Sequence, residues 1–363
     1  MCNQITLNIN HSEQYSIHTG YDLRAELFDY LGAQFTTRKS ILIVDENVYK
    51  LHADYFIDAV NKHFDQVITY VVPEGEHSKS LEHFEKILDL VLESGVDRKT
   101  PVLAVGGGVV GDLAGFVAAS CLRGLPLIHI PTTLLAMVDS SIGGKTGINH
   151  TLGKNLIGAF YQPKAVFADL KFLETLSEQQ WIIGLSEVIK YAMIRDASLF
   201  DLLDETSFKV SATDYKGWEQ IIHRSAHIKV DVVAEDVKEA GIREFLNFGH
   251  TFAHVIERVG NYKQYSHGEA VFMGMWAAVY VSQKLGHPIN HSNLSTFRPL
   301  YTSKLQVSNT PSELTALMLH DKKVSDGVVK LVLVSELEKP FTKLFKDTKL
   351  IDEAWAYTLE EFN

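Results

Sequence analysis

The most constraining feature of the sequence is the run of glycines within Val102-Leu-Ala-Val-Gly-Gly-Gly-Val-Val-Gly-Asp-Leu-Ala-Gly-Phe116. Apolar residues after Pro101 predict a short buried strand, and small apolar residues over Val109–Ser120 predict a helix. The three glycines at 106–108 lie between them, in a bend that only residues without a Cβ enter at low cost. The stretch therefore predicts a strand, a tight glycine turn and a helix in direct succession.

This arrangement predicts an anion site. Free backbone N–H groups and the positive end of the helix dipole converge at a helix N-terminus, and a pyrophosphate bridge is the usual occupant. The spacing differs from the common Gly-x-Gly-x-x-Gly fingerprint of dinucleotide sites. The alternative is a tight connection without a ligand. Three consecutive glycines cost backbone entropy in a well-packed run, which favours the ligand.

Composition restricts the class of protein and of partner. At 363 residues the chain exceeds the usual size of one core, so two domains are expected. The net charge of -11 argues against nucleic acid or an anionic membrane as partner. Two cysteines, Cys2 and Cys121, suit a reducing compartment. The first residues lack a secretory signal, and the longest apolar tract, Val102–Leu122, has too many glycines for a membrane span. We expect a cytoplasmic protein.

Strands alternate with helices in the first half of the chain. Expected strands include Ser40–Val44, Val67–Val72 and Leu127–Ile130, each separated from the next by a helical segment. This alternation predicts a parallel, doubly wound α/β domain of the Rossmann type, with ligands at the carboxyl ends of the strands. Asp45 directly follows the strand Ser40–Val44. An acid at this place either holds a ribose hydroxyl or, equally, caps the next helix.

Polar residues gather after the strand at Leu127–Ile130. They are Pro131-Thr-Thr133, Asp139, Gly143-Gly-Lys-Thr146 and Lys154-Asn155. We expect them to line the ligand cleft, and a lysine in a glycine-rich turn, such as Lys145, can approach a phosphate closely. Helical periodicity dominates after Phe172. The sequence therefore predicts an α/β domain over 1–175 and a mainly α-helical domain over 176–363.

Three sites in the helical half carry metal-ligand side chains. Glu187 lies in an apolar helix, and His250 and His267 lie in similar apolar settings. Two histidines and one carboxylate, with a fourth position left open, form the usual catalytic zinc pattern. His254 follows His250 by four residues, so spacing alone also allows it as a ligand. Each histidine taken singly is more often a core residue than a ligand.

Several stretches together resemble the 3-dehydroquinate synthase family. They are Gly106–Gly115, Ile130–Asn149, Gly153–Ala159, Glu187–Tyr191, Leu246–Thr251, His267–Ala270 and Asp321–Lys323, and they follow the family's order. Ser186 stands where the family usually has alanine, and Ala253 where it usually has glycine. The resemblance covers about residues 40–325 and leaves 1–38 and the C-terminal end with little motif.

The resemblance implies an NAD-binding α/β domain, a helical metal-binding domain, and the cofactors NAD and Zn²⁺, with Co²⁺ as a possible substitute. It implies the metal ligands Glu187, His250 and His267, with His254 as a substrate contact. The implied NAD residues are Asp45, Glu76, Lys79, Gly107, Gly108, Val109, Asp112, Thr132, Thr133, Lys145, Lys154, Phe172 and Thr175. The implied substrate residues are Asp139, Lys145, Asn155, Lys190, Lys229, Arg243, Asn247, His254 and Lys322. Arg123 matches a residue that reaches the neighbouring subunit's site, which implies a homodimer.

The implied activity is conversion of 3-deoxy-D-arabino-heptulosonate 7-phosphate into 3-dehydroquinate and phosphate, a lyase step of the shikimate pathway towards aromatic amino acids. The expected sequence is transient oxidation by NAD, phosphate elimination, re-reduction and intramolecular aldol closure. One alternative is a sister sugar phosphate cyclase. Another is a metal-dependent polyol dehydrogenase of the related superfamily, for which the phosphate-facing lysines are hard to explain. A third is a catalytically silent NAD sensor.

Overall fold

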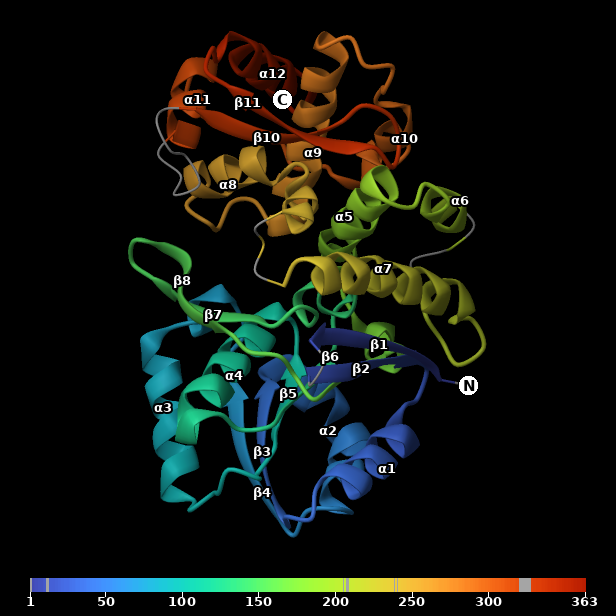
Figure 1. Ribbon diagram of the computed structural model, residues 1–363, viewed down its shortest axis with the longest axis vertical. Helices are drawn as coiled ribbons and strands as arrows, with labels where there is room; N and C mark the ends of the chain where they lie inside the picture. Colours follow the sequence, from blue (N-terminus) through green and yellow to red (C-terminus); the bar gives the residue numbers. More distant parts are fainter. Residues whose placement is uncertain are drawn as a thin grey trace. The chain divides into compact units, whose positions relative to one another are not determined.

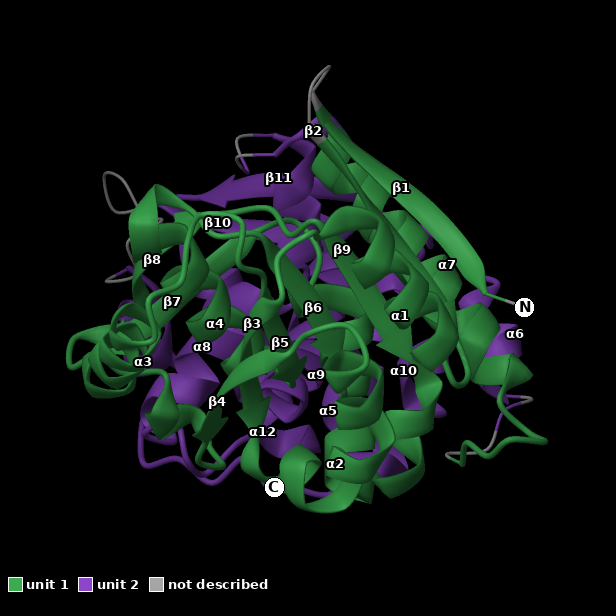
Figure 2. Cartoon of the chain, turned by 90° about the horizontal axis from the view of Figure 1, so that it is seen from below, with its two compact units in different colours: residues 1–181, 207–234 green, residues 182–206, 235–363 purple. Residues whose placement is uncertain are grey.

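A computed structural model describes residues 2–10, 13–204, 206, 209–237, 239, 241–319 and 328–363. The chain forms two compact units, which Figure 2 shows in different colours. The first contains residues 1–181 and 207–234, and the second contains 182–206 and 235–363. The domain boundary expected near residue 175 remains a prediction. The compact units divide at residue 181, and the segment 207–234 returns to the first unit.

The first unit is built on a seven-stranded sheet with strand order β1-β2-β9-β6-β5-β3-β4. Only β1 is antiparallel to its neighbour, and the other pairs are parallel. Its strands are β1 (Asn3–Asn10), β2 (Glu13–Gly20), β3 (Lys39–Asp45), β4 (Gln66–Val72), β5 (Val102–Gly106), β6 (Leu127–Pro131) and β9 (Ala165–Asp169). The predicted parallel α/β domain is therefore confirmed.

Helices cover both faces of this sheet, with α3 and α4 on one side and α1 and α2 on the other (Figure 1). Their bounds are α1 (Arg24–Gln34), α2 (Glu46–Asn61), α3 (Leu81–Glu93) and α4 (Gly108–Ser120). The middle strands are apolar where both of their faces are buried, as in residues 41–44 of β3 and in β5. Ile41, Ile43 and Val102 pack with α3 and α4 in one core cluster.

Two elements of the first unit depart from a simple strand-and-helix alternation. Strands β7 (Lys145–His150) and β8 (Gly153–Phe160) form a separate hairpin where the sequence predicts only a polar loop. Helix α7 (Lys216–Glu235), from the helical half of the sequence, packs Ala226, Val230 and Val233 against β1, β2 and Ile142. Helical periodicity reveals an apolar face, but it does not reveal which core receives that face.

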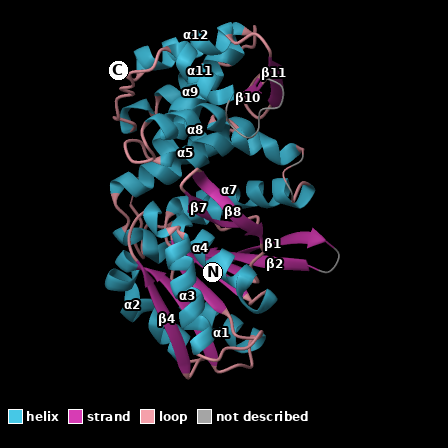
Figure 3. Cartoon of the chain, turned by 90° about the vertical axis from the view of Figure 1, so that its left-hand side faces the viewer, coloured by secondary structure: helices cyan, strands magenta, loops and turns pink. Residues whose placement is uncertain are grey.

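The second unit is dominated by helices, as Figure 3 shows by colour, and the prediction of a mainly α-helical part is confirmed. Its helices include α6 (Leu199–Asp204), α8 (His250–Val259), α9 (His267–Lys284), α10 (Ser292–Ser295), α11 (Pro311–Leu319) and α12 (Lys349–Glu361), and α5 (Glu178–Ile194) enters it at residue 182. The antiparallel hairpin β10 (Val329–Val334) and β11 (Pro340–Phe345) was not predicted. In the described part of the chain, no helix is long and apolar enough to cross a membrane.

One buried histidine of the central sheet makes stability depend on pH. His129 lies on β6, is 5% exposed, and packs against Gly111 of α4, where an added Cβ would stand 3.5 Å from the imidazole. Burial lowers the pKa of His129 from 6.5 to about 4. The unfolded chain therefore takes up this proton before the folded chain does, so stability falls as pH decreases from about 6.5 towards 4.

We expect wild-type protein to lose roughly 2 kcal/mol more stability than His129→Leu between about pH 7.5 and pH 5, since one pKa unit corresponds to about 1.4 kcal/mol. Chemical denaturation of the metal-free proteins at the two pH values measures this difference. Parallel pH dependence in wild type and variant would contradict the assignment.

Candidate functional site

The predicted anion site of the first unit lies at the N-terminus of α4. Gly107 is the N-cap residue and supplies no side-chain cap, and the first turn contains no acidic residue. The first N–H groups of α4 therefore have no intrahelical partner and no side-chain acceptor at the cap. Thr132, at the end of the neighbouring strand, is 3% exposed, and its Oγ1 makes no hydrogen bond within the described residues. A donor-rich, uncapped helix end of this kind fits a pyrophosphate.

The predicted cofactor residues Glu76, Lys79 and Asp112 lie in one polar network with Asn155, which was assigned to the substrate. Lys79 is buried, and its Nζ donates to Asp112 Oδ2 at 2.7 Å and to Asn155 Oδ1 at 2.5 Å. Burial opposes the charge on Lys79, but the carboxylates of Asp112 and Glu76 outweigh it and raise the pKa of this lysine. Lys79 therefore stays a cation in a largely dry setting.

Asn149 completes this network, although the sequence reasoning gave it no role. Its Nδ2 donates to Glu76 Oε1 at 2.9 Å, and its Oδ1 accepts from the backbone N of Asn155 at 2.9 Å. Asn155 has a left-handed backbone, with φ of 53°, which this bond supports. Asn149 thus ties the β7–β8 hairpin to the turn that carries Glu76 and Lys79. The only available signal was its place inside the long motif Ile130–Asn149.

Asp139 and Lys229 come together from distant parts of the sequence. Lys229 Nζ donates to Asp139 Oδ1 at 2.6 Å, and the lysine is almost fully buried on α7. The loop after Asp139 is held from the other side, because Gly143 N donates to Tyr15 Oη at 3.1 Å. Tyr15 lies on β2, within the first 38 residues, for which no motif predicted a role. Strand β2 and helix α7 therefore position this loop together.

The remaining predicted cofactor positions differ in their surroundings. Asp45 caps α2, because its Oδ1 accepts hydrogen bonds from the backbone N atoms of Asn47 and Val48. Of the two roles expected for Asp45, this is the helix cap. Thr133 Oγ1 accepts from Ala136 N at 3.2 Å. Gly108 and Val109 form the first turn of α4. Lys145 begins β7 opposite Phe160, and Lys154 lies on β8 near the turn, at the other end of the hairpin. A ribose contact of Asp45 stays a prediction.

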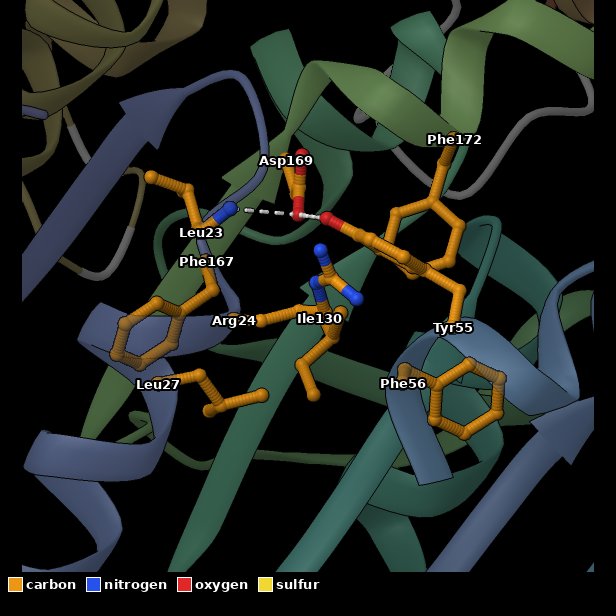
Figure 4. A pocket seen from close by; sticks show the side chains of 9 residues that line it. All are labelled: Leu23, Arg24, Leu27, Tyr55, Phe56, Ile130, Phe167, Asp169 and Phe172. Atoms are coloured by element: carbon orange, nitrogen blue, oxygen red, sulfur yellow. Dashed lines mark hydrogen bonds between the residues drawn. The ribbon is translucent and has the colours of Figure 1, made fainter. Parts of the chain in front are cut away.

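A small, mostly apolar pocket of the first unit lies beside Phe172 (Figure 4). Phe172 lines it and is 3% exposed, while Thr175 Oγ1 lies 2.6 Å from His52 Nε2. In the same pocket Tyr55 donates to Asp169 Oδ2, which also accepts from Leu23 N at 2.9 Å. The Asp169 carboxylate is thus already satisfied by the protein, and Phe172 is mainly a packing residue here.

The three predicted metal ligands converge in the second unit. Ligand atoms of Glu187, His250 and His267 all lie within 4.8 Å of one another. His250 Nε2 and His267 Nε2 are each 3.6 Å from Glu187 Oε1. These distances exceed those of hydrogen bonds but approach the edge, about 3.3 Å, of a tetrahedron with metal–ligand bonds of about 2.0–2.1 Å. The donor set and its spacing therefore fit a divalent metal such as Zn²⁺.

Two of the metal-ligand side chains, Glu187 and His250, are also held by protein atoms outside the triad. Lys190 Nζ donates to Glu187 Oε2, so Oε1 is the oxygen that faces the histidines. His250 Nδ1 lies 3.2 Å from the carbonyl oxygen of Phe248, which leaves Nε2 towards the carboxylate. Burial lowers the pKa of His250 to about 3, so its imidazole is neutral and can donate a lone pair. The ring centre of His254 is 6.0 Å from that of His250, and His254 is outside the triad.

Arg243 and Asn247, predicted to recognise substrate, lie on the short 3₁₀ helix Ile242–Asn247. Arg243 is 1% exposed, and its Nη1 donates to the carbonyl oxygen of Val237 at 2.7 Å. It is therefore no member of a surface ion pair, whereas Glu244 pairs with Lys330 at the surface. Asn247 Nδ2 donates to Glu239 Oε1 at 2.9 Å. Lys322 lies outside the described residues.

Known proteins resemble the chain over nearly its whole length. Family models of the 3-dehydroquinate synthase N-terminal and C-terminal parts match residues 69–183 and 184–324. The 3-dehydroquinate synthase of Salinibacter ruber is 44% identical, over 84% of this chain and 83% of its own length. That of Desulforamulus reducens is 39% identical, over 94% and 96%.

The structure also matches a solved sugar phosphate cyclase. A 2-deoxy-scyllo-inosose synthase complexed with carbaglucose-6-phosphate, NAD+ and Co²⁺ superposes with a TM-score of 0.85. It is 26% identical in sequence, and the match covers 97% of this chain and 98% of the other. The identity to the curated relatives is much higher and spans both units. The chain belongs to the 3-dehydroquinate synthase family.

Proposed function

We propose that the chain converts 3-deoxy-D-arabino-heptulosonate 7-phosphate into 3-dehydroquinate and phosphate, using NAD and a divalent metal as cofactors. The observation that carries this proposal is the convergence of Glu187, His250 and His267, in a chain 39–44% identical to 3-dehydroquinate synthases. The uncapped helix end at Gly107 supports NAD as the second cofactor. The solved relative named above contains NAD+ and Co²⁺, which agrees with this pair of cofactors.

The two cofactors supply different parts of the chemistry: NAD accepts and returns a hydride, and the metal acts as a Lewis acid towards substrate hydroxyls. We assign the metal to Glu187, His250 and His267. NAD is assigned to the first unit, at Gly107, Gly108, Val109, Thr132, Thr133 and the residues grouped with them above. In this unit Lys79 stays charged beside Asp112, which suits it to an anionic cofactor.

Buried cations explain how a chain of net charge -11 binds an anionic sugar phosphate. Lys229 is held by Asp139, Lys190 by Glu187, and Arg243 by a backbone carbonyl, so none must be ordered when substrate binds. Fixed cations stabilise a desolvated phosphate or carboxylate far more than mobile surface lysines do. We assign Lys145, Asn155, Asn247 and His254 to the same task, with Lys322, as side chains that hold substrate or move its protons.

We propose in addition that the enzyme is a homodimer in which Arg123 serves the neighbouring site. Leu122 and Arg123 both have left-handed backbones, with φ of 48° and 66°. Consecutive non-glycine residues in this region are strained, and such strain is found at functional positions. Arg123 is exposed at the end of this turn, so it can reach a second copy. We also place the enzyme in the cytoplasm, which suits the unpaired thiols of Cys2 and Cys121.

Phosphate release from the pure heptulosonate phosphate tests the proposed function. We expect stoichiometric phosphate and cyclised product, without net accumulation of NADH, because the cofactor is reduced and reoxidised within one turnover. Accumulating NADH would identify a polyol dehydrogenase instead. Turnover of sedoheptulose phosphate with little turnover of the heptulosonate phosphate would identify a sister cyclase.

The assigned metal ligands predict a specific pattern among alanine variants. Glu187→Ala and His267→Ala should lose bound metal and activity while keeping the fold, because the apolar cores of both units are formed by other residues. Glu187→Ala should also lower stability, since it leaves Lys190 buried without this carboxylate. His254→Ala should keep its metal and lose rate. Metal analysis and circular dichroism of the purified variants measure this. Equal metal loss in His254→Ala would show that the ligand set is wrong.

The buried guanidinium of Arg243 leads to a prediction of how the enzyme distinguishes its substrate from sugar phosphates that lack a carboxylate. Removing one partner of a buried charge pair costs roughly 2–5 kcal/mol. Arg243→Ala should therefore lower kcat/KM for the heptulosonate phosphate more than about thirtyfold, since each ~1.4 kcal/mol is a factor of about ten. NAD affinity and metal content should not change. A loss below about fivefold would argue against recognition of the carboxylate by Arg243.

A further inference from the structure

Glu257 is a buried carboxylate close to the triad that the sequence reasoning did not single out. It lies on α8, and 4% of the residue is exposed. Glu257 is seven positions after His250 and three positions after His254, so the three side chains share one face of the helix. The neighbouring positions Phe252, Val255 and Ile256 are apolar and buried. A carboxylate in such a setting needs a charged or proton-donating partner.

That partner is one of the metal ligands. Glu257 Oε1 lies 3.6 Å from His267 Nδ1, and the other ring nitrogen, Nε2, lies 3.6 Å from Glu187 Oε1. The imidazole of His267 therefore has a carboxylate at each of its nitrogens. Only a nitrogen without a proton can bind a metal, and Nε2 is the one within the triad. The proton of His267 then belongs on Nδ1, the nitrogen that faces the Glu257 carboxylate at ion-pair distance.

The two histidine ligands are held by different acceptors. His250 Nδ1 faces the neutral carbonyl oxygen of Phe248 at 3.2 Å, whereas His267 Nδ1 faces a carboxylate. A charged acceptor makes the imidazole a stronger electron donor than a neutral carbonyl does. Glu257 also changes the local charge. Lys190 offsets the negative charge of Glu187, and Glu257 supplies a second negative charge beside a cation site.

We propose that Glu257 is a positioning residue, which fixes the tautomer and orientation of His267 so that Nε2 faces the metal with Glu187 and His250. It lies outside the group of three ligands found among the described residues, so it acts through His267 and not as a fourth ligand. This inference rests on the proposed metal role of the triad and is independent of which sugar phosphate the enzyme uses.

Metal affinity of purified variants tests the proposal without any activity assay. Glu257→Gln keeps the shape and one acceptor oxygen but removes the charge, and Glu257→Ala removes both. We expect Co²⁺ and Zn²⁺ affinity, measured by chelator competition, to fall about 10–100-fold in Glu257→Ala and less in Glu257→Gln. The visible absorption bands of the Co²⁺ protein should also change in both variants, because the geometry of His267 changes.

Glu269→Gln is the matched control. Glu269 is a carboxylate two residues from His267 on α9, but it bonds Ser266 and Ser303. Glutamine also suits the third position of a capping box, so this replacement should keep the helix cap and leave the Co²⁺ affinity and spectrum as in wild type.

The outcomes separate this inference from the function on which it rests. Wild-type protein that binds neither metal would overturn the metal role of the triad itself. Wild-type binding with unchanged affinity and spectrum in both Glu257 variants would overturn the role of Glu257 alone. If Glu257→Ala does not fold, Glu257→Gln decides, and an effect of Glu269→Gln as large as that of Glu257→Gln would also overturn the proposal.

Discussion

Charges held away from water are the constraint on which both candidate sites depend. Glu187 is 1% exposed, and Lys190, Lys229 and Arg243 are buried as well. A buried charge without a partner costs several kcal/mol, so each of these groups must be matched by another part of the fold. The matching partners are Lys190 for Glu187, Asp139 for Lys229 and a backbone carbonyl for Arg243. Held in this way, the groups are ordered before any ligand arrives.

The same constraint explains the connectivity of the first unit. Helix α7 comes after the segment 182–206 of the second unit, yet it belongs to the first unit and brings Lys229 to Asp139. Its apolar face packs on the β1–β2 pair, in the cluster that includes Tyr15 and Ile142. Strands β1 and β2 belong to no recognised motif. They nevertheless hold both the loop that contains Gly143 and helix α7.

Sequence patterns predicted the regular parts well, for identifiable reasons. Strands β3, β5 and β6 are short, mainly apolar runs between turn signals, and the glycines at 106–108 mark the turn into α4. None of these glycines has a positive φ. Close packing is what requires glycine there, because a Cβ added at Gly106 would stand 2.7 Å from the Val110 side chain. The hairpins β7–β8 and β10–β11 were missed. In β8 most side chains are partly or fully exposed, so the alternation that marks a half-buried strand is absent. Glu257 was missed although it shares a helix face with His250, because one carboxylate on a helix is no signal by itself.

The sequence by itself determined the doubly wound sheet, the glycine turn and the residue types that can bind NAD, metal and phosphate, because these depend on local geometry and side-chain chemistry. Only the tertiary structure decided which atoms meet. Spacing alone allowed His254 to be a ligand instead, and the fold brings Nε2 of His267 to Glu187 Oε1. It likewise decided that Lys229 meets Asp139 and that Glu257 meets His267. Contacts between distant segments depend on how complete elements pack, and no local pattern in the chain contains that information.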